Sequence, residues 1–201
     1  MATVKKPDSS SPTRLRILDN AARLFRERGY GGTSQRDIAA ACGIQAGSLY
    51  YHFASKEEVL AEVLELGIQR PMTALREALA ELDSDATPRE RLRVAVRTHL
   101  HALFTQGDYT SAHFRIMHVA PAEVQSRSVE VRDAYETLWM SLLNDLKAAG
   151  ELRGDVDLRI VRLFLIGGVN MTLDWFREGE YSLNQLADQY IDFILNGVAT
   201  T

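Results

Sequence analysis

Apolar residues recur at helical spacing along most of the chain. Near the N-terminus Leu15, Leu18, Ala22 and Phe25 fall three or four positions apart, which makes one face of a helix apolar. Gly29 follows as a C-terminal stop. Few stretches alternate apolar and polar residues with the period of two that marks a half-buried strand. The pattern therefore predicts an all-α protein.

Polar residues mark where the next helices begin. Ser34, with Asp37 three positions later, is typical of a capping box, and we expect this second helix to end near Gly43. A short third helix fits residues 45–51. Ser55 opens a fourth helix through a second capping box with Glu58, and Pro71 is expected to end or kink it.

The later pattern predicts a series of longer helices. Their expected ranges are 72–82, 88–105, 109–118, 122–149, 157–177 and 182–196. Residues 1–12, rich in Ser, Pro and Lys, are expected to form a disordered arm. We expect a small domain over residues 13–58 and a larger helical bundle over residues 59–201.

Charge is divided unevenly along the chain. Residues 1–56 hold nine Lys and Arg against four Asp and Glu, a net charge of +5, and residues 57–201 hold 14 against 23, or −9. A basic N-terminal region can neutralise phosphates, while the acidic remainder limits non-specific adhesion to nucleic acid. Neither a run of roughly 18 apolar residues nor an apolar signal core is present. We expect a cytoplasmic protein with no membrane partner.

Catalytic and metal-binding patterns are lacking. The single Cys42 lies among alanines and suits a small buried packing residue. His99 and His101 would point to nearly opposite faces of a helix, and His113 and His118 are five positions apart, so neither pair converges on a metal. There is no nucleophile elbow or phosphate loop. We expect no catalytic residue, metal or cofactor.

Ala39, Gly43 and Leu49 have the spacing of a helix-turn-helix. That motif needs a small residue where two helices approach, a glycine in the turn and an apolar residue that seats the second helix. An ordinary helical hairpin would explain this spacing equally well. The polar groups of the third helix favour a nucleic-acid reader, because they are too numerous for a helix that only packs: Gln45, Ser48, Tyr50, Tyr51 and His52.

Specific DNA contacts can be expected from these groups. Gln45 can read a base edge, preferring adenine, while Ala46 and Gly47 allow the backbone near the groove floor or a thymine methyl. Thr33 and Ser34 at the start of the second helix, and Lys56 at the start of the fourth, would bind phosphates on either side of the groove.

The run from Thr33 to Ile44, followed by GSLYYHF over 47–53 and SKEE over 55–58, resembles the signature of the TetR family. The resemblance covers residues 13–64. It implies phosphate contacts from Tyr50, Tyr51, His52 and Lys56, anchoring by Thr33 or Ser34, and base contacts from Gln45 to Ser48. It also implies a ligand-responsive repressor that binds a palindromic double-stranded DNA operator as a homodimer.

In this family the remaining helices dimerise and hold a small-molecule effector. Residues 163–169 are apolar without interruption, so a helix here is buried on more than one side and one side needs a partner. Burial within one subunit is the alternative. With the last helix, this segment is expected to form a four-helix dimer seam. The expected interface residues are Phe164, Gly167, Gly168, Trp175, Leu186, Tyr190 and Ile194.

Polar and aromatic residues within apolar helices are candidates for an effector pocket. They are His113, Phe114, Met117, His118, Tyr135, Trp139, Asn170 and Asp174. Each is also explained as a satisfied core or interface residue. The segment 170–178 is similar to that of family members that sense acyl-CoA thioesters, which implies a small apolar or acyl-CoA-like effector.

Two other functions stay open at this point. One is an α-helical small-molecule enzyme or carrier with a vestigial helix-turn-helix, which turnover of a candidate ligand would support. The other is an activator that uses the same DNA-binding helices, because residues alone do not separate activation from repression.

Overall fold

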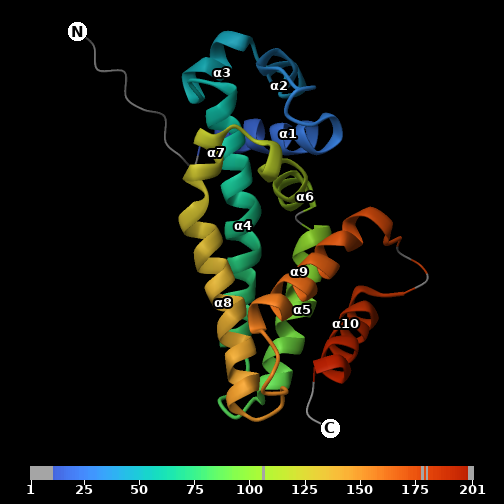
Figure 1. Ribbon diagram of the computed structural model, residues 1–201. Coiled ribbons are helices and arrows are strands. Elements are labelled where there is room, and N and C mark those ends of the chain that lie inside the picture. The colour runs from blue at the N-terminus through green and yellow to red at the C-terminus, as the bar shows by residue number, and fades with distance from the viewer. Residues whose placement is uncertain (1–10, 106, 178, 180, 199–201) are drawn as a thin grey trace. The chain divides into compact units, whose positions relative to one another are not determined.

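The computed structural model describes residues 11–105, 107–177, 179 and 181–198, and no strand occurs among them (Figure 1). Its helices are α1 (Pro12–Arg28), α2 (Gln35–Ala41), α3 (Ala46–His52), α4 (Lys56–Ala80), α5 (Pro88–Thr105), α6 (Gly107–Ile116), the 3-10 turn η1 (Met117–Val119), α7 (Ala122–Arg127), α8 (Val129–Ala148), α9 (Leu158–Trp175) and α10 (Leu183–Val198). The predicted all-α class is confirmed. Most of the predicted N-terminal arm, residues 1–10, lies outside the described residues.

The helices form two compact units. Unit 1 comprises Met1–Ile68 and Asp108–Glu130, and unit 2 comprises Gln69–Gly107 and Val131–Thr201. The division falls inside α4, ten residues beyond the expected boundary at residue 58, because the first half of α4 contributes Val59, Leu60 and Leu64 to the core of unit 1. None of the described helices is long and apolar enough to cross a bilayer.

The core of unit 1 begins with α1. Ser11 caps this helix by accepting a hydrogen bond from the Arg14 backbone N–H, and Gly29 ends it with a φ of 70°, as the sequence predicts. The buried face of α1 includes Ile17, Leu18 and Phe25. It packs in one cluster with apolar residues of α2, α3, α4, α6 and α7.

α4 corrects one prediction. The sequence predicts that Pro71 ends or kinks the fourth helix and that a separate helix covers 72–82, but α4 runs unbroken from Lys56 to Ala80. A proline removes one backbone hydrogen bond and clashes with the preceding turn. Buried Ile68, Met72 and Leu75 on both sides of it keep the segment helical.

The segment 122–149 corrects a second prediction. In place of one helix, α7 ends at Arg127 and α8 starts at Val129. Between them Ser128 is fully buried, with φ −94° and ψ 2°. Its backbone conformation lies outside the helical region and turns the chain there.

Gly67 is a point of close approach between α4 and α6. A Cβ built on Gly67 would lie 2.6 Å from the carbonyl oxygen of Tyr109 and 2.8 Å from Cβ of His113. His113 Nδ1 lies 3.0 Å from the Leu64 carbonyl oxygen, and the Tyr109 hydroxyl donates to Asp19. These contacts hold α6 against α4 and α1 within unit 1.

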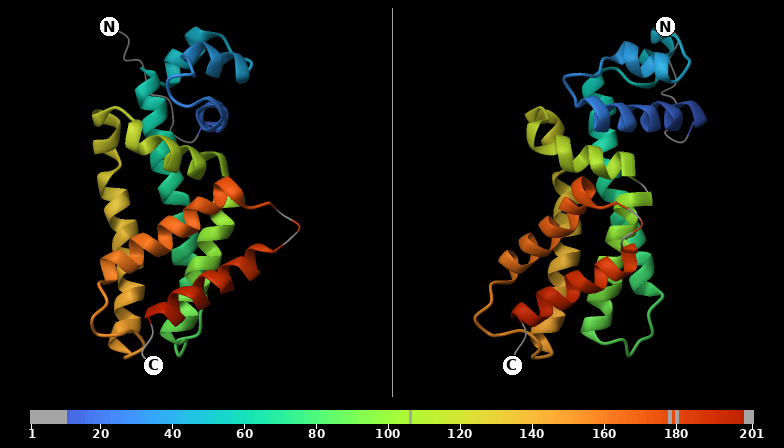
Figure 2. Two further views of the ribbon diagram at one scale, coloured as in Figure 1. Left: turned by 45° about the vertical axis from the view of Figure 1, so that its right-hand side comes forward. Right: turned by 90° about the vertical axis from the view of Figure 1, so that its right-hand side faces the viewer.

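Unit 2 is built around α5. This helix packs against α9 and α10, and its Arg97 donates to both carboxylate oxygens of Asp188 on α10 at 2.8 Å (Figure 2). Its buried face holds Leu92, Leu100 and Leu103, with His99 in the same row. Unit 2 therefore buries a polar side chain among its apolar residues.

Candidate nucleic-acid interface and effector domain

The helix-turn-helix turn has the geometry that the sequence predicts. Gly43 has a φ of 65°, and the N–H of Ile44 donates to the carbonyl of Ala39 at 3.0 Å. Ala39 and Leu49 are buried, 2% and 0% exposed, where α2 and α3 meet. Because only glycine adopts this φ without strain, the turn is sharp and the second helix is held close to the first.

The start of α2 is stabilised by a complete capping box. The Ser34 hydroxyl oxygen accepts from the Asp37 N–H, and the Asp37 carboxylate accepts from the Ser34 N–H at 2.8 Å. Hydrogen bonds from Ser34 hold the pKa of Asp37 below its usual value. Ser34 is exposed, which is compatible with the predicted phosphate contact.

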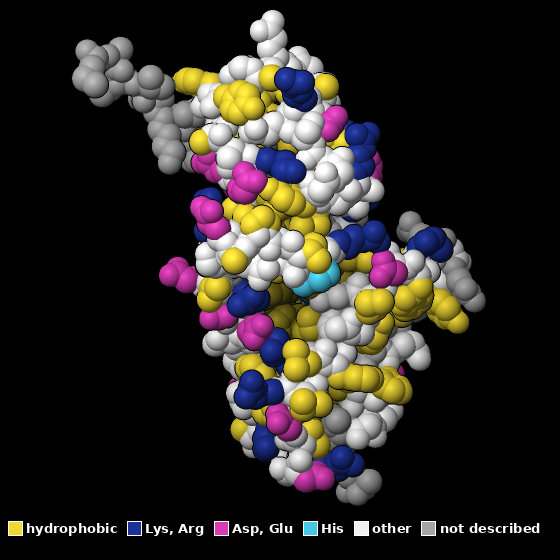
Figure 3. Space-filling model, turned by 45° about the horizontal axis from the view of Figure 1, so that its top comes forward, with side chains coloured by type: hydrophobic (Ala, Val, Ile, Leu, Met, Phe, Trp, Pro, Cys, Tyr) yellow, Lys and Arg dark blue, Asp and Glu magenta, His cyan; other side chains and the backbone are white. Residues whose placement is uncertain are grey.

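α3 presents mostly polar and aromatic groups to solvent. Tyr50 and Tyr51 are 55% and 56% exposed, and Gln45, Gly47 and Ser48 are exposed as well. Ala46 is half-buried. In the upper part of the view in Figure 3, hydrophobic side chains lie among basic and some acidic ones. Such a surface offers hydrogen bonds, ring faces and positive charge together, as nucleic-acid binding requires.

Thr33 is placed differently from the other predicted contacts. It is 1% exposed, and its hydroxyl lies within hydrogen-bond distance of the Gly29 and Leu24 carbonyls, at 3.0 and 3.3 Å. The side chain stabilises the end of α1 and the start of α2 from inside. The resemblance left the anchor open between Thr33 and Ser34, and only Ser34 has an exposed side chain.

Lys56 is also engaged within unit 1. Its ammonium donates to the carbonyls of Tyr30 and Thr33, both at 3.0 Å, and lies 3.8 Å from the centre of the Tyr30 ring. The Tyr30 hydroxyl in turn donates to Glu57. Burial, with help from Glu57, raises the pKa of Tyr30 to about 12. Two of the three N–H groups of the ammonium are thus used within unit 1.

His52 lies at the end of α3 with its ring edge-on to Tyr51, at 5.2 Å between ring centres. Burial, and then the positive charge of Arg14, lower the pKa of His52. In the free protein these two effects favour the neutral form of the imidazole, whose ring N–H is a hydrogen-bond donor.

α9 carries a continuous apolar stripe on the outside of unit 2. Large apolar side chains along one side of this helix are 52–62% exposed: Ile160, Leu163, Phe164, Met171 and Trp175. Gly167 lies in the middle of the stripe, and Phe193 of α10, 67% exposed, stacks on Phe164 at 6.1 Å. We call Ile160, Leu163, Phe164, Gly167, Met171 and Trp175 the α9 stripe.

The other predicted interface residues lie inside the protomer or between α9 and α10. Leu186 and Ile194 are 9% and 5% exposed. The Tyr190 hydroxyl donates to the Gly168 carbonyl at 2.8 Å, so these two residues join the two helices.

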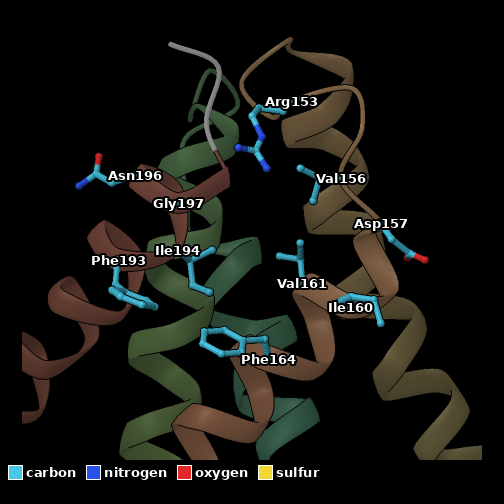
Figure 4. A pocket seen from close by; sticks show the side chains of 10 residues that line it. All are labelled: Arg153, Val156, Asp157, Ile160, Val161, Phe164, Phe193, Ile194, Asn196 and Gly197. Carbon is cyan, nitrogen blue, oxygen red and sulfur yellow. The ribbon is translucent and has the colours of Figure 1, made fainter.

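A cavity of about 690 Å³ opens between the ends of α9 and α10. Figure 4 shows Phe193 and Ile194 on one side of it, Val156, Ile160 and Val161 on the other, and Phe164 at its base. Its walls are mostly apolar and include residues of the α9 stripe. A partner that covers the stripe would therefore also cover this cavity.

A polar cluster is enclosed at the centre of unit 2. His99 of α5 is fully buried, with Nδ1 2.7 Å from the Tyr135 hydroxyl and Nε2 2.8 Å from Oδ1 of Asn170. Burial lowers the pKa of His99 to about 4, so the ring is neutral. Trp139, 5.7 Å from the His99 ring, has a buried indole N–H without a hydrogen-bond partner among the described residues.

The predicted effector residues fall in both units. His113, Phe114, Met117 and His118 lie on α6 and η1 in unit 1, where His113 is buried and His118 is exposed. Tyr135, Trp139, Asn170 and Asp174 lie in unit 2. The structure brings the first three together around His99 and leaves Asp174 exposed.

Two family models together match most of the chain. The model described as "Bacterial regulatory proteins, tetR family" matches residues 17–63, and "Tetracyclin repressor-like, C-terminal domain" matches residues 85–198. The HTH-type transcriptional repressor KstR2 of Rhodococcus jostii is 33% identical over 193 residues, covering 94% of this chain and 93% of that protein. The chain belongs to the TetR family.

Solved TetR-family structures agree with this fold. The ketosteroid transcriptional regulator KstR2 of Mycobacterium tuberculosis has a TM-score of 0.79 at 28% identity, covering 98% of this chain and 100% of that chain. PfmR from Thermus thermophilus has a TM-score of 0.77 at 30% identity, covering 90% and 97%. The exposed α3 thus belongs to a transcriptional regulator.

Sequence reasoning missed two residues of this TetR-family protein. His99 was considered only as a metal ligand, although a histidine in the apolar row of a helix signals a buried polar contact. Arg14 contacts His52 at the end of α3 and Glu62 on α4, which lie 38 and 48 positions further along the chain. No local pattern marks that contact.

Proposed function

We propose that the protein is a homodimeric repressor that binds a palindromic DNA operator and is released by a small effector. The exposed face of α3 carries the proposal, because it joins polar groups and two exposed tyrosines on a helix-turn-helix. Base contacts come from Gln45, Ala46, Gly47 and Ser48, and phosphate contacts from Ser34, Tyr50, Tyr51, His52 and the remaining N–H of Lys56.

A second copy of the chain covers the α9 stripe. Large exposed apolar patches mark protein interfaces, and a two-fold interface uses the same patch on both copies. Phe164, Gly167, Gly168 and Trp175 then lie at the seam, with Tyr190 behind Gly168. In the bound dimer the two α3 helices enter successive major grooves, about 34 to 36 Å apart.

The effector binds in unit 2 near Tyr135, Trp139 and Asn170. The buried polar and aromatic groups around His99 support this site, because ligand pockets combine mostly apolar walls with a few precisely placed polar groups. A ligand with an apolar body and one polar end fits this mixture of apolar and polar groups. Acyl-CoA-like molecules are ligands of this kind. The ligand and the operator then weaken each other's binding reciprocally. The protein acts in the cytoplasm and has no catalytic activity of its own.

Selection of binding sites from a random duplex library tests the proposal. We expect a palindromic sequence, a footprint of two half-sites, and a dimer by light scattering. Recovery of no enriched sequence would overturn it. Turnover of a ligand would instead support the enzyme or carrier.

A further inference from the structure

Arg14 is a cation that unit 1 encloses. Only 11% of its side chain is exposed, although it lies on the first helix next to the surface of α3. One terminal nitrogen donates to the His52 carbonyl at 2.7 Å, and the other is paired with Glu62 of α4. The guanidinium carbon lies 3.9 Å from the centre of the Phe53 ring.

These contacts meet at the C-terminal end of α3. The last carbonyls of a helix have no partner within the helix, and a cation placed there satisfies them and interacts favourably with the helix dipole. Arg14 supplies this at His52, the last residue of α3, and its planar face covers Phe53, the residue that follows. The end of α3 is therefore joined to α1 and α4 through one side chain.

α3 depends on such outside contacts. It has seven residues, too few for a helix that is stable alone, and its N-cap residue Gln45 makes no side-chain capping bond. Buried Leu49 and Phe53 seat one face, but apolar contacts fix direction less strictly than hydrogen bonds do. The Arg14 bond determines where the last turn of α3 lies.

The arrangement leaves Arg14 no fork for DNA. An arginine that binds a phosphate presents two N–H groups outward, whereas here each terminal nitrogen donates one N–H inside, Nε is buried, and only 11% of the side chain is exposed. One of the cations in the basic N-terminal region is thus not available to phosphates.

We propose that Arg14 is a positioning residue for operator binding. This inference rests on the proposed function, in which α3 reads DNA. The guanidinium fixes the end of α3 from which Tyr50, Tyr51 and His52 project, and binding groups must be held within about 0.5 Å of their productive positions. Operator affinity therefore depends on Arg14 although the side chain does not contact DNA.

Salt dependence of binding separates this role from a phosphate contact. Each phosphate contact contributes about 0.9 to the slope of log affinity against log salt concentration. For Arg14→Met, which keeps an unbranched stem over Phe53, we expect operator affinity to fall about tenfold or more with an unchanged slope. A slope lowered by about 0.9 would overturn the proposal.

Two further variants separate positioning from loss of stability. Ile17→Val shortens a fully buried residue of α1 and leaves the His52 bond in place, so it is expected to bind as the wild type does at a temperature well below unfolding. Glu62→Gln keeps Arg14 but removes its charge partner, and we expect a smaller loss of affinity, again with unchanged slope. If Arg14→Met does not fold, Glu62→Gln decides, and wild-type affinity for that variant overturns the proposal.

The DNA in this experiment is the duplex that the wild-type protein selects from a random library. If the wild type selects no sequence, the proposed function itself has failed. If the wild type binds its selected duplex and folded Arg14→Met binds it equally well, only the role of Arg14 has failed.

Discussion

Unit 1 and unit 2 distribute their polar and apolar side chains in opposite ways. In unit 1 the large apolar residues of α1 to α3 are buried except for Leu15, which is exposed although the sequence placed it on the apolar face, and α3 exposes two tyrosines and small polar residues. In unit 2, α9 exposes a stripe of large apolar residues while His99 lies buried. Exposed hydrogen-bonding groups and rings suit a nucleic acid, and an exposed apolar stripe suits a protein surface. The exposed side chains of each unit thus suit the partner that we propose for it.

Phe164→Glu gives the largest expected effect on this comparison. A charge in the middle of the α9 stripe must be desolvated twice in a two-fold interface, so we expect the dimer to be weakened by about 4 kcal/mol or more. Sedimentation or light scattering measures the dissociation. Val119→Glu, at another exposed apolar residue, is the control and should leave the dimer intact. A dimer of wild-type strength in Phe164→Glu would place the interface elsewhere.

His99 tests the inverse feature, the buried polar group of unit 2. Its pKa of about 4 lies below the ordinary 6.5, so below pH 6.5 the unfolded chain takes up a proton that the folded chain does not. This contribution of His99 to the free energy of unfolding is fully present above pH 6.5. As the pH falls to about 4, the free energy of unfolding decreases by about 1 to 3 kcal/mol. Urea unfolding at each pH measures it.

His99→Gln should lose this share of the pH dependence, and it should retain the rest, which comes from other groups. His101→Gln, at an exposed position on the same helix, should keep the full dependence of the wild type. Identical pH profiles for His99→Gln and the wild type would show that His99 does not titrate as proposed.

Lys56→Met tests whether a cation of unit 1 stabilises the fold or only binds DNA. It removes two hydrogen bonds to the carbonyls of Tyr30 and Thr33, and we expect the free energy of unfolding to fall by about 2 kcal/mol. Arg36→Met makes the same charge change at an exposed site on α2 and should cost less than about 0.5 kcal/mol. Unchanged stability of Lys56→Met would assign the ammonium to phosphate alone.

Two glycine substitutions, one in each unit, are expected to have the smallest effects on stability. A Cβ at Gly47 or at Gly167 would meet no atom within 4 Å, so each Gly→Ala change should stabilise its helix by about 0.5 to 1 kcal/mol. Gly47→Ala should weaken operator binding and leave the dimer unchanged, whereas Gly167→Ala should weaken the dimer and should lower operator binding only at protein concentrations where the dimer dissociates. Calorimetry, operator titration and light scattering test this, and the same response from both variants would contradict it.

Predictions from the sequence were most accurate where neighbours along the chain decide the structure. The glycine turn at Gly43, the capping box at Ser34 and the stop at Gly29 follow from residues within about four positions, and each was confirmed. The separate helix expected after Pro71 was wrong, because α4 continues through the proline, where packing on both sides outweighs its local preference.

Local sequence thus determined most of the helices, the helix-turn-helix and the exposed polar face of α3, because hydrogen bonds and apolar periodicity within a helix join near neighbours. Tertiary structure decided how those elements are held. Arg14 reaches His52 across 38 positions, Lys56 reaches Tyr30 across 26, and His99 reaches Asn170 across 71. Such pairings depend on the packed geometry of several helices at once. A pattern along one helix does not specify them, which is why a cation of the basic N-terminal region turns out to hold α3 in place.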